Sequence, residues 1–250
     1  RLCYMGTVLR TRADGFGGSR SPYQAGVELY GHRGYESDLE VLTLMLETLA
    51  VANIADVHLD LGHVAIFREL VRQAGLDHDQ EKILFEALQR KALPEIRRQL
   101  MAWRLAPSAE RLLSHLAELN GDMAVLTEAE ALLAGTGAAI DAALVTLRRL
   151  VTALQRYRPE LPIHIDLAEL RGYDYHTGVL FSAYVPGRGH AVAQGGRYDE
   201  IGQVFGRARP ATGFSTDLAP LLRLSEPPGR IHRGIYAPDT DDPALERQVV

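Results

Sequence analysis

Two segments of the sequence combine the residue types that hold small polar ligands. Residues 171–178 read Arg-Gly-Tyr-Asp-Tyr-His-Thr-Gly, and residues 194–199 read Gln-Gly-Gly-Arg-Tyr-Asp. An arginine can grip a carboxylate in a forked geometry that lysine cannot match, and glycines permit the tight turns that bring the backbone close to a ligand. Both segments are therefore candidate binding loops.

A purely structural role is the alternative for these two segments. Asp174 paired with Arg171, and Asp199 paired with Arg197, would fix the geometry of the turns without any ligand. Composition favours neither role, and the choice depends on what else in the chain can reach the same site.

A predicted strand over residues 23–30 supplies a further set of polar side chains. Residues 25, 27 and 29 are apolar and alternate with other residues, which is the pattern of a strand with one buried face. Side chains two positions apart share a face, so Gln24, Glu28 and Tyr30 lie together on the other side. A solvated strand face is the simpler interpretation. Together with the two loops, the strand indicates a site assembled from distant parts of the chain.

The common catalytic and cofactor signatures are missing from the sequence. It has no Gly-Lys pair of a phosphate-binding loop, no His-Glu-x-x-His and no Gly-x-Ser-x-Gly. None of the nine histidines stands at metal-ligand spacing with carboxylates. The search for these signatures therefore identifies no catalytic residue, metal or cofactor.

The composition is that of a globular protein of 250 residues, with 46% hydrophobic and 24% charged residues. The net charge of −5 disfavours a large RNA partner such as tRNA, because RNA binding requires a basic surface. The single cysteine, Cys3, excludes a disulfide framework and fits a reducing compartment. No apolar run reaches the roughly 18 residues of a membrane-spanning helix, and the chain starts without a secretory leader. We expect a cytoplasmic protein with no membrane partner.

The elements that position these residues follow from the hydrophobic periodicity. Strands are predicted early and late in the chain, and a glycine turn at residues 187–189 predicts a hairpin. A capping box formed by Ser37 and Glu40 predicts the start of an amphipathic helix that ends near Asn53. The predicted strands cover residues 4–10, 23–30, 57–61, 162–168, 178–185, 190–194 and 211–217.

The middle of the chain has a different character. Residues 64–157 show helical periodicity throughout, broken at glycines and prolines. Strands on both sides of a helical middle predict an α+β protein with an antiparallel sheet. We expect residues 1–63 and 162–225 to form the core, residues 64–161 a helical insertion, and residues 226–250 a linker and the start of a short C-terminal segment.

The two candidate loops resemble a known family. Residues 171–178 resemble the histidine-binding motif of histidyl-tRNA synthetases, usually Arg-Gly-Leu-Asp-Tyr-Tyr-Thr-Gly, and residues 194–199 resemble the Gly-Gly-Arg-Tyr-Asp loop of that family. The segment from Val8 to Glu28 is similar to motif 2 of class II synthetases, and residues 213–217 fall where motif 3 begins. The resemblance implies a class II synthetase-like antiparallel sheet flanked by helices, with a helical insertion.

The sequence departs from the synthetases in the parts that bind ATP. Motif 2 of a synthetase has Arg-x-Glu; Arg10 is kept, but Arg12 stands in place of the glutamate. The motif 3 arginine that holds the γ-phosphate is replaced by Pro220, which cannot donate a hydrogen bond, and Asp217 adds a negative charge nearby. ATP activation is therefore not expected. Arg10 is either an anion-binding residue or retained scaffold.

This combination resembles the regulatory subunits of ATP phosphoribosyltransferase, a family paralogous to the synthetases that shares the stretch from residue 205 to residue 215. The resemblance implies a non-catalytic protein that activates a short catalytic phosphoribosyltransferase chain and dimerises within a hetero-oligomer. It also implies histidine feedback on the first step of histidine biosynthesis. The alternatives are the catalytic core of a histidyl-tRNA synthetase and a structural dimerisation module without a ligand site.

A free histidine presents an ammonium, a carboxylate and an imidazole, and the expected pocket offers a partner for each. Glu28 can accept a hydrogen bond from an imidazole N–H, and Gln24 can accept one from the ammonium. Arg171 can pair with the carboxylate. Tyr175 and His176 are expected at the imidazole end, where synthetases carry a tyrosine in place of His176.

Overall fold

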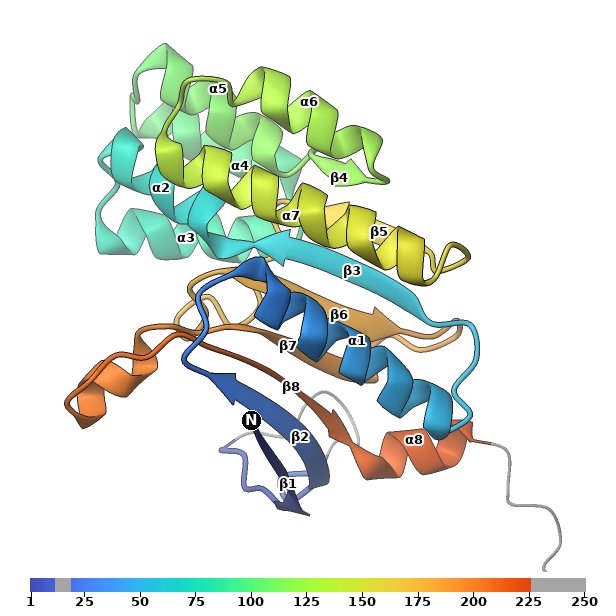
Figure 1. The fold of residues 1–250 in the computed structure, drawn as a ribbon. Coiled ribbons are helices and arrows are strands. Elements are labelled where there is room, and N and C mark those ends of the chain that lie inside the picture. The colour runs from blue at the N-terminus through green and yellow to red at the C-terminus, as the bar shows by residue number, and fades with distance from the viewer. Residues whose placement is uncertain (12–18, 226–250) are drawn as a thin grey trace, which may run out of the picture.

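The computed structural model describes residues 1–11 and 19–225, and their strands form one sheet with the order β1-β2-β8-β7-β6-β3-β5-β4 (Figure 1). The α+β prediction is confirmed, and β8, from late in the chain, lies between β2 and β7. The strands are β1 (Leu2–Thr7), β2 (Tyr23–Tyr30), β3 (His58–His63), β4 (Asn120–Gly121), β5 (Ile163–Asp166), β6 (Val179–Tyr184), β7 (Ala193–Arg197) and β8 (Ala211–Asp217).

The described strand pairs are antiparallel, except that β3 and β5 run parallel. The prediction of an antiparallel sheet is therefore wrong at this pair. Parallel neighbours need a long crossover connection, and the helices between residues 64 and 157 provide it. The crossover places β5 beside β3 and so sets the position of the loop that follows β5.

Two long helices cover one face of the sheet (Figure 1). Helix α1 (Tyr35–Val51) contacts β2, β7 and β8, and α7 (Ala138–Tyr157) contacts β3, β6 and α1. Their buried side chains recur at helical spacing, as in Leu42, Leu46 and Leu49 of α1, none more than 1% exposed. The other helices are α2 (Val64–Ala74), α3 (His78–Gln89), α4 (Leu93–Ala102), α5 (Pro107–Leu116), α6 (Ala124–Leu132), α8 (Leu218–Leu224) and the 3₁₀ helix η1 (Ile201–Phe205).

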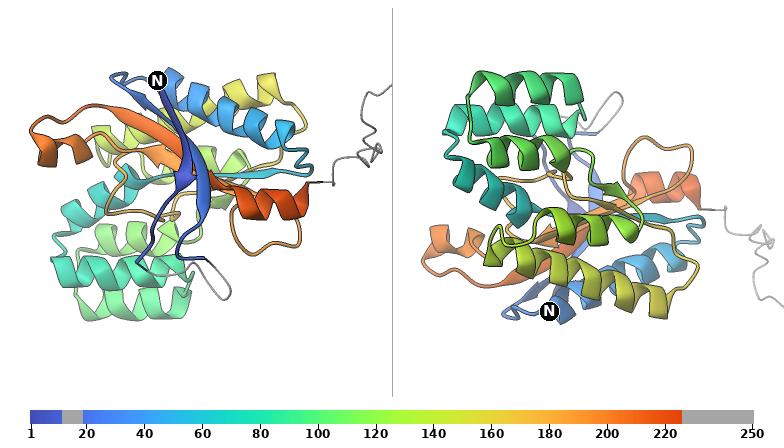
Figure 2. Two further views of the ribbon diagram at one scale, coloured as in Figure 1. Left: turned by 90° about the horizontal axis from the view of Figure 1, so that it is seen from below. Right: turned by 90° about the horizontal axis from the view of Figure 1, so that it is seen from above.

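Helices α2–α5 pack against one another beside the end of the sheet that holds β3 and β5 (Figure 1). In the view from below in Figure 2, β1 and β2 cross the direction of β3. Neighbouring strands rotate by a constant hand, so a sheet of this width accumulates a large twist.

The predicted capping box at Ser37 is wrong. Helix α1 begins at Tyr35 after Gly34, so Ser37 lies within the first turn. Its hydroxyl donates to the Gly34 carbonyl at 2.7 Å and accepts from Arg197 at 2.7 Å. The Ser37 hydroxyl therefore bonds to Arg197, which is distant in the sequence, and does not cap the helix as the local pattern predicted.

Two further predictions need correction. The strand predicted at residues 190–194 is β7, Ala193–Arg197, because its register is set by pairing with β6, where Ala183 lies opposite Ala193. The middle of the chain is not helical throughout, since β4 pairs with β5. The linker and C-terminal segment predicted at residues 226–250, and Arg12, lie outside the described residues.

Candidate functional site

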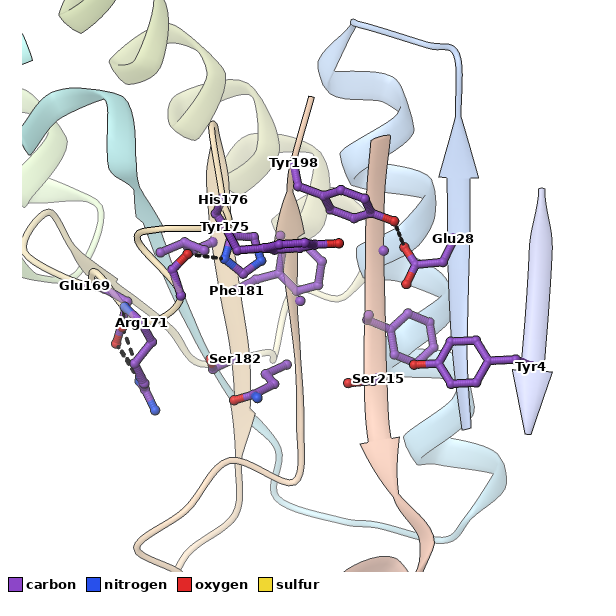
Figure 3. A pocket seen from close by; sticks show the side chains of 17 residues that line it. Tyr4, Glu28, Glu169, Arg171, Tyr175, His176, Phe181, Ser182, Tyr198 and Ser215 are labelled. Atoms are coloured by element: carbon purple, nitrogen blue, oxygen red, sulfur yellow. Dashed lines mark hydrogen bonds and ion pairs between the residues drawn. The ribbon is translucent and has the colours of Figure 1, made fainter. Parts of the chain in front are cut away.

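The face of the sheet opposite α1 and α7 carries a cavity of about 220 Å³ (Figure 3). Leu29 of β2 is buried in the core, and the alternation of the strand turns Glu28 to the opposite face. The loop after β5 closes one side of the cavity, so strands and loop contribute together. The polar and aromatic lining comprises Tyr4, Glu28, Glu169, Arg171, Tyr175, His176, Phe181, Ser182, Gln194, Tyr198, Phe214 and Ser215.

Glu28 and Tyr198 form the central polar contact of this cavity. The Tyr198 hydroxyl donates to the Glu28 carboxylate from the segment after β7 (Figure 3). Burial raises the pKa of the Glu28 carboxyl, although the Tyr198 hydrogen bond acts in the opposite direction. A Cβ atom at Gly213 of β8 would lie 1.9 Å from Glu28 Oε2, so glycine is required there for the carboxylate to lie against the sheet.

Aromatic side chains form one wall of the cavity. The Tyr175 ring lies 4.7 Å from the Tyr198 ring and is tilted by 31°, and it meets His176 edge to face at 5.2 Å. Such offset and edge contacts are the favoured arrangements of aromatic pairs. The wall is therefore suited to a planar ring such as an imidazole.

His176 is held between two glycines. Cβ atoms at Gly172 and Gly196 would lie 2.5 and 2.6 Å from its ring atoms, and Gly172 has a positive φ of 69°. His176 Nδ1 lies 3.1 Å from the Gly172 carbonyl oxygen. Burial lowers the pKa of His176, so the neutral ring donates from Nδ1 to that carbonyl and presents Nε2 as an acceptor.

Arg171 forms an ion pair with Glu169 of the same chain, a partner that the sequence analysis did not identify. Glu169 accepts from Arg171 Nε at 2.9 Å and also from Nη2 and the backbone N–H (Figure 3). The Arg171 guanidinium also lies 5.4 Å from the Tyr184 ring. Among the described residues this partner is Glu169 and not Asp174, so the proposed structural ion pair Arg171–Asp174 is wrong.

A second cavity of about 460 Å³ adjoins the first, and the two share Arg171, Gly172, Gln194 and Ser215. Its lining also includes Pro220.

Gln24 lies in this second cavity, not beside Glu28. Its Oε1 accepts from the Tyr4 hydroxyl at 2.8 Å, and its Nε2 donates to Asp217 Oδ1 at 3.1 Å. Arg10 lies 3.1 Å from the same carboxylate. Arg10, which was a candidate for binding an anionic ligand, is thus paired with Asp217.

Arg197 has a structural role, as expected from the alternative in which it pairs with Asp199 to fix the turn. Its side chain is 8% exposed and pairs with Asp38 at 2.9 Å and with Asp199 at 3.1 Å. It ties α1 to β7 and does not line either cavity.

The predicted site residues therefore divide between the two cavities. Glu28, Arg171, Tyr175 and His176 line the first, while Gln24 and Arg10 line the second. Sequence reasoning missed Tyr4, Glu169 and Tyr198. Tyr198 lies within the conspicuous segment 194–199, so it was available as a candidate. Tyr4 and Glu169 carry no local signal, because only strand pairing and the loop path bring them to the cavity.

No group of three His, Cys, Asp or Glu side chains within residues 1–11 and 19–225 could hold a metal ion. In the same part of the chain, no helix is long and apolar enough to cross a membrane.

Comparison with sequences of known proteins gives consistent matches. Residues 1–221 match the model of the family described as histidyl-tRNA synthetase. A protein from Thioalkalivibrio sulfidiphilus named ATP phosphoribosyltransferase regulatory subunit is 58% identical over 98% of this chain, and one of the same name from Nitrosococcus oceani is 55% identical over 100% of it. The chain spans 62% of the length of each of these relatives.

Solved structures show the same architecture. A Bacillus halodurans protein described as an ATP phosphoribosyltransferase regulatory subunit/histidyl-tRNA synthetase superposes with a TM-score of 0.79 at 27% identity, over 90% of this chain and 58% of its own. Histidyl-tRNA synthetase from Nostoc has a TM-score of 0.72 at 19% identity, over 88% of this chain and 52% of its own. The second match bears on the fold alone.

Proposed function

The chain belongs to the histidyl-tRNA synthetase family, and on that premise we propose that it is part of a regulatory subunit of ATP phosphoribosyltransferase. It is non-catalytic: it binds free histidine, activates a short catalytic phosphoribosyltransferase chain, and mediates feedback on the first step of histidine biosynthesis. Relatives of that name, 49–58% identical over nearly the whole chain, support this assignment.

The observation that carries the proposal is the Arg10–Asp217 ion pair in the second cavity. A nucleotide triphosphate placed there would meet a carboxylate, and the nearby arginine would already be neutralised. Pro220 lines the same cavity and offers no donor. The arrangement supports a protein that holds an amino acid without activating it.

The first cavity supports histidine as the ligand. Glu28 and Tyr198 offer polar partners to the imidazole, and the Tyr175 ring offers a stacking surface. Arg171, which lines both cavities, would meet the carboxylate. Gln24 and Asp217 place amide and carboxylate oxygens where an ammonium could lie. The first cavity, of about 220 Å³, would hold the imidazole, and the ammonium would lie in the adjoining second cavity.

A bound ligand can regulate a partner only if it binds the active and inactive states of the complex with different affinity. We propose that the chain acts in the cytoplasm, self-associates as a dimer within a hetero-oligomer, and does not bind tRNA. The net charge of −5 supports the last point.

Two measurements on the protein test its function. Isothermal titration calorimetry with L-histidine should show binding, and an ATP–pyrophosphate exchange assay with histidine should show no turnover above buffer. Exchange above the buffer control would instead identify the chain as the catalytic core of a histidyl-tRNA synthetase. Absence of histidine binding would favour a structural module.

The partner is tested by co-expression with a short catalytic phosphoribosyltransferase chain. The two chains should co-purify, and histidine should inhibit the complex. Failure of the two chains to associate would contradict the proposed regulatory role.

A further inference from the structure

Glu169 occupies the Nε–Nη2 edge of the Arg171 guanidinium. It accepts from Arg171 Nε at 2.9 and 3.1 Å through its two oxygens and also accepts from Nη2. A fourth bond, from the Arg171 backbone N–H at 2.8 Å, holds the carboxylate in this orientation. A guanidinium offers a limited number of forked donor pairs, and Glu169 uses one of them.

Glu169 is charged where it lies. Its side chain is only 13% exposed, while that of Arg171 is 45% exposed. Burial disfavours the carboxylate, but hydrogen bonds from Arg171 and the positive charge of Lys91 bring the pKa of Glu169 below its usual range. An ionised carboxylate therefore lines the cavity at neutral pH.

A second cation, Lys91, lines a cavity together with Glu169. Lys91 Nζ is bound to Asp166 Oδ1 at 2.6 Å, and Lys91, Asp166, Glu169 and Arg171 line one further cavity together. Glu169 thus lies in a cavity whose lining contains two positive and two negative side chains. Its charge interacts with Lys91 as well as with Arg171, and this interaction helps to lower the pKa of Glu169.

We propose that Glu169 is a specificity-determining residue that competes with the carboxylate of the bound amino acid for Arg171. The inference rests on the proposed function, because it takes histidine as the ligand. Either the two carboxylates share one guanidinium and repel each other, or the ligand carboxylate displaces Glu169 from Arg171. In both cases Glu169 weakens binding of ligands that carry a carboxylate and leaves others unaffected.

The test compares two ligands on two proteins. Calorimetry is performed with L-histidine and with L-histidinol, which has a hydroxymethyl group in place of the carboxylate, on the wild-type chain and on Glu169→Gln. The variant should bind histidine about fivefold more tightly or better, since a like charge is removed, and histidinol within about twofold of wild type. Glu86→Gln, an exposed glutamate on α3, serves as the matched control, and thermal unfolding of each protein verifies folding.

The outcomes separate this inference from the proposed function. Weaker or unchanged histidine binding by a folded Glu169→Gln variant would show that Glu169 positions Arg171 and does not compete, and it would overturn the inference alone. An equal gain for histidine and histidinol would also overturn it, because competition acts on the carboxylate. If neither protein binds either ligand, histidine is not the ligand, and the proposed function fails together with the inference.

Discussion

The guanidinium of Arg10 lies 3.1 Å from the carboxylate of Asp217, although the two residues are 207 positions apart in the sequence. Gln24 donates to the same carboxylate at 3.1 Å from the neighbouring strand β2. Asp217 therefore neutralises a cation and orients an amide in the second cavity.

Replacing Asp217 with asparagine removes this neutralisation while keeping the side-chain shape. Asp217→Asn should bind inorganic pyrophosphate about tenfold more tightly than wild type at low salt, because the substitution removes a negative charge from the cavity that Arg10 also lines. Calorimetry measures the difference. The double variant Arg10→Gln/Asp217→Asn should lose the gain, and equal affinities of Asp217→Asn and wild type would contradict the role given to the ion pair.

Gly213 is required for the position of Glu28. A Cβ atom there would lie 1.9 Å from Glu28 Oε2 and 2.5 Å from the Val27 carbonyl oxygen, so Gly213→Ala should push the carboxylate and the β2 backbone away. We expect histidine affinity to fall by about tenfold or more, as for a lost charged hydrogen bond. Gly6→Ala, on β1 of the same sheet, is the control, since nothing lies within 4 Å of a Cβ at that position. Unchanged affinity in Gly213→Ala would remove Glu28 from the ligand site.

Arg197 is predicted to be a major contributor to stability. Its side chain is 8% exposed and that of Asp38 is 2% exposed, so Arg197→Met leaves a buried carboxylate without its cation. We expect a loss of about 3–5 kcal/mol in the free energy of unfolding, measured by urea denaturation. Arg188→Met, in the exposed turn between β6 and β7, should change it by less than about 0.5 kcal/mol. Similar losses in both variants would contradict the assignment.

Tyr173 links the loop of residues 171–178 to helices α2 and α3. Its hydroxyl donates to Glu81 of α3, and Arg68 of α2 donates to its carbonyl at 2.6 Å and lies 4.8 Å from its ring. Tyr173→Phe should cost about 1–2 kcal/mol and accelerate hydrogen exchange of the amides of Tyr175 and His176, which bond to Gly172.

A matched pair tests this effect of the Tyr173 hydroxyl. Tyr157 also donates to a glutamate, Glu47, but its side chain is 51% exposed. Tyr157→Phe should therefore change the free energy of unfolding by less than about 0.5 kcal/mol. Unaltered exchange of the loop amides in Tyr173→Phe would show that the loop does not depend on the Glu81 contact.

His63 makes stability depend on pH. Burial, and then the charge of Arg197, lowers the pKa of His63 from 6.5 to about 4, so folding favours the neutral ring. The contribution is present above pH 6.5 and is lost as the pH falls from 6.5 toward about 4, because the unfolded chain then binds a proton that the folded chain rejects.

The variant His63→Asn isolates this effect, because asparagine can also cap α2 but does not titrate. Urea unfolding at pH 7.5 and pH 5 should show that wild type loses about 1–2 kcal/mol more than the variant over this interval. Parallel losses in the two proteins would assign the acid sensitivity to other groups.

Local pattern was enough to predict most of the elements. The alternation over residues 23–30 placed Gln24 and Glu28 on one face of β2, and the helical periodicity of residues 64–157 is present in the structure apart from β4. Sequence could not place strand bounds such as those of β7, because register depends on the partner strand β6.

The sequence by itself determined which chemical groups are available: an arginine in a glycine-rich loop, a glutamate on an alternating strand, and a proline and an aspartate near the end of β8. Only the tertiary structure decided their partners. In the structure, Glu169 pairs with Arg171, Tyr198 with Glu28, and Asp217 with Arg10. The reason is physical: periodicity fixes the direction of a side chain within its own element, whereas an ion pair or hydrogen bond forms within about 3 Å and depends on how distant elements pack.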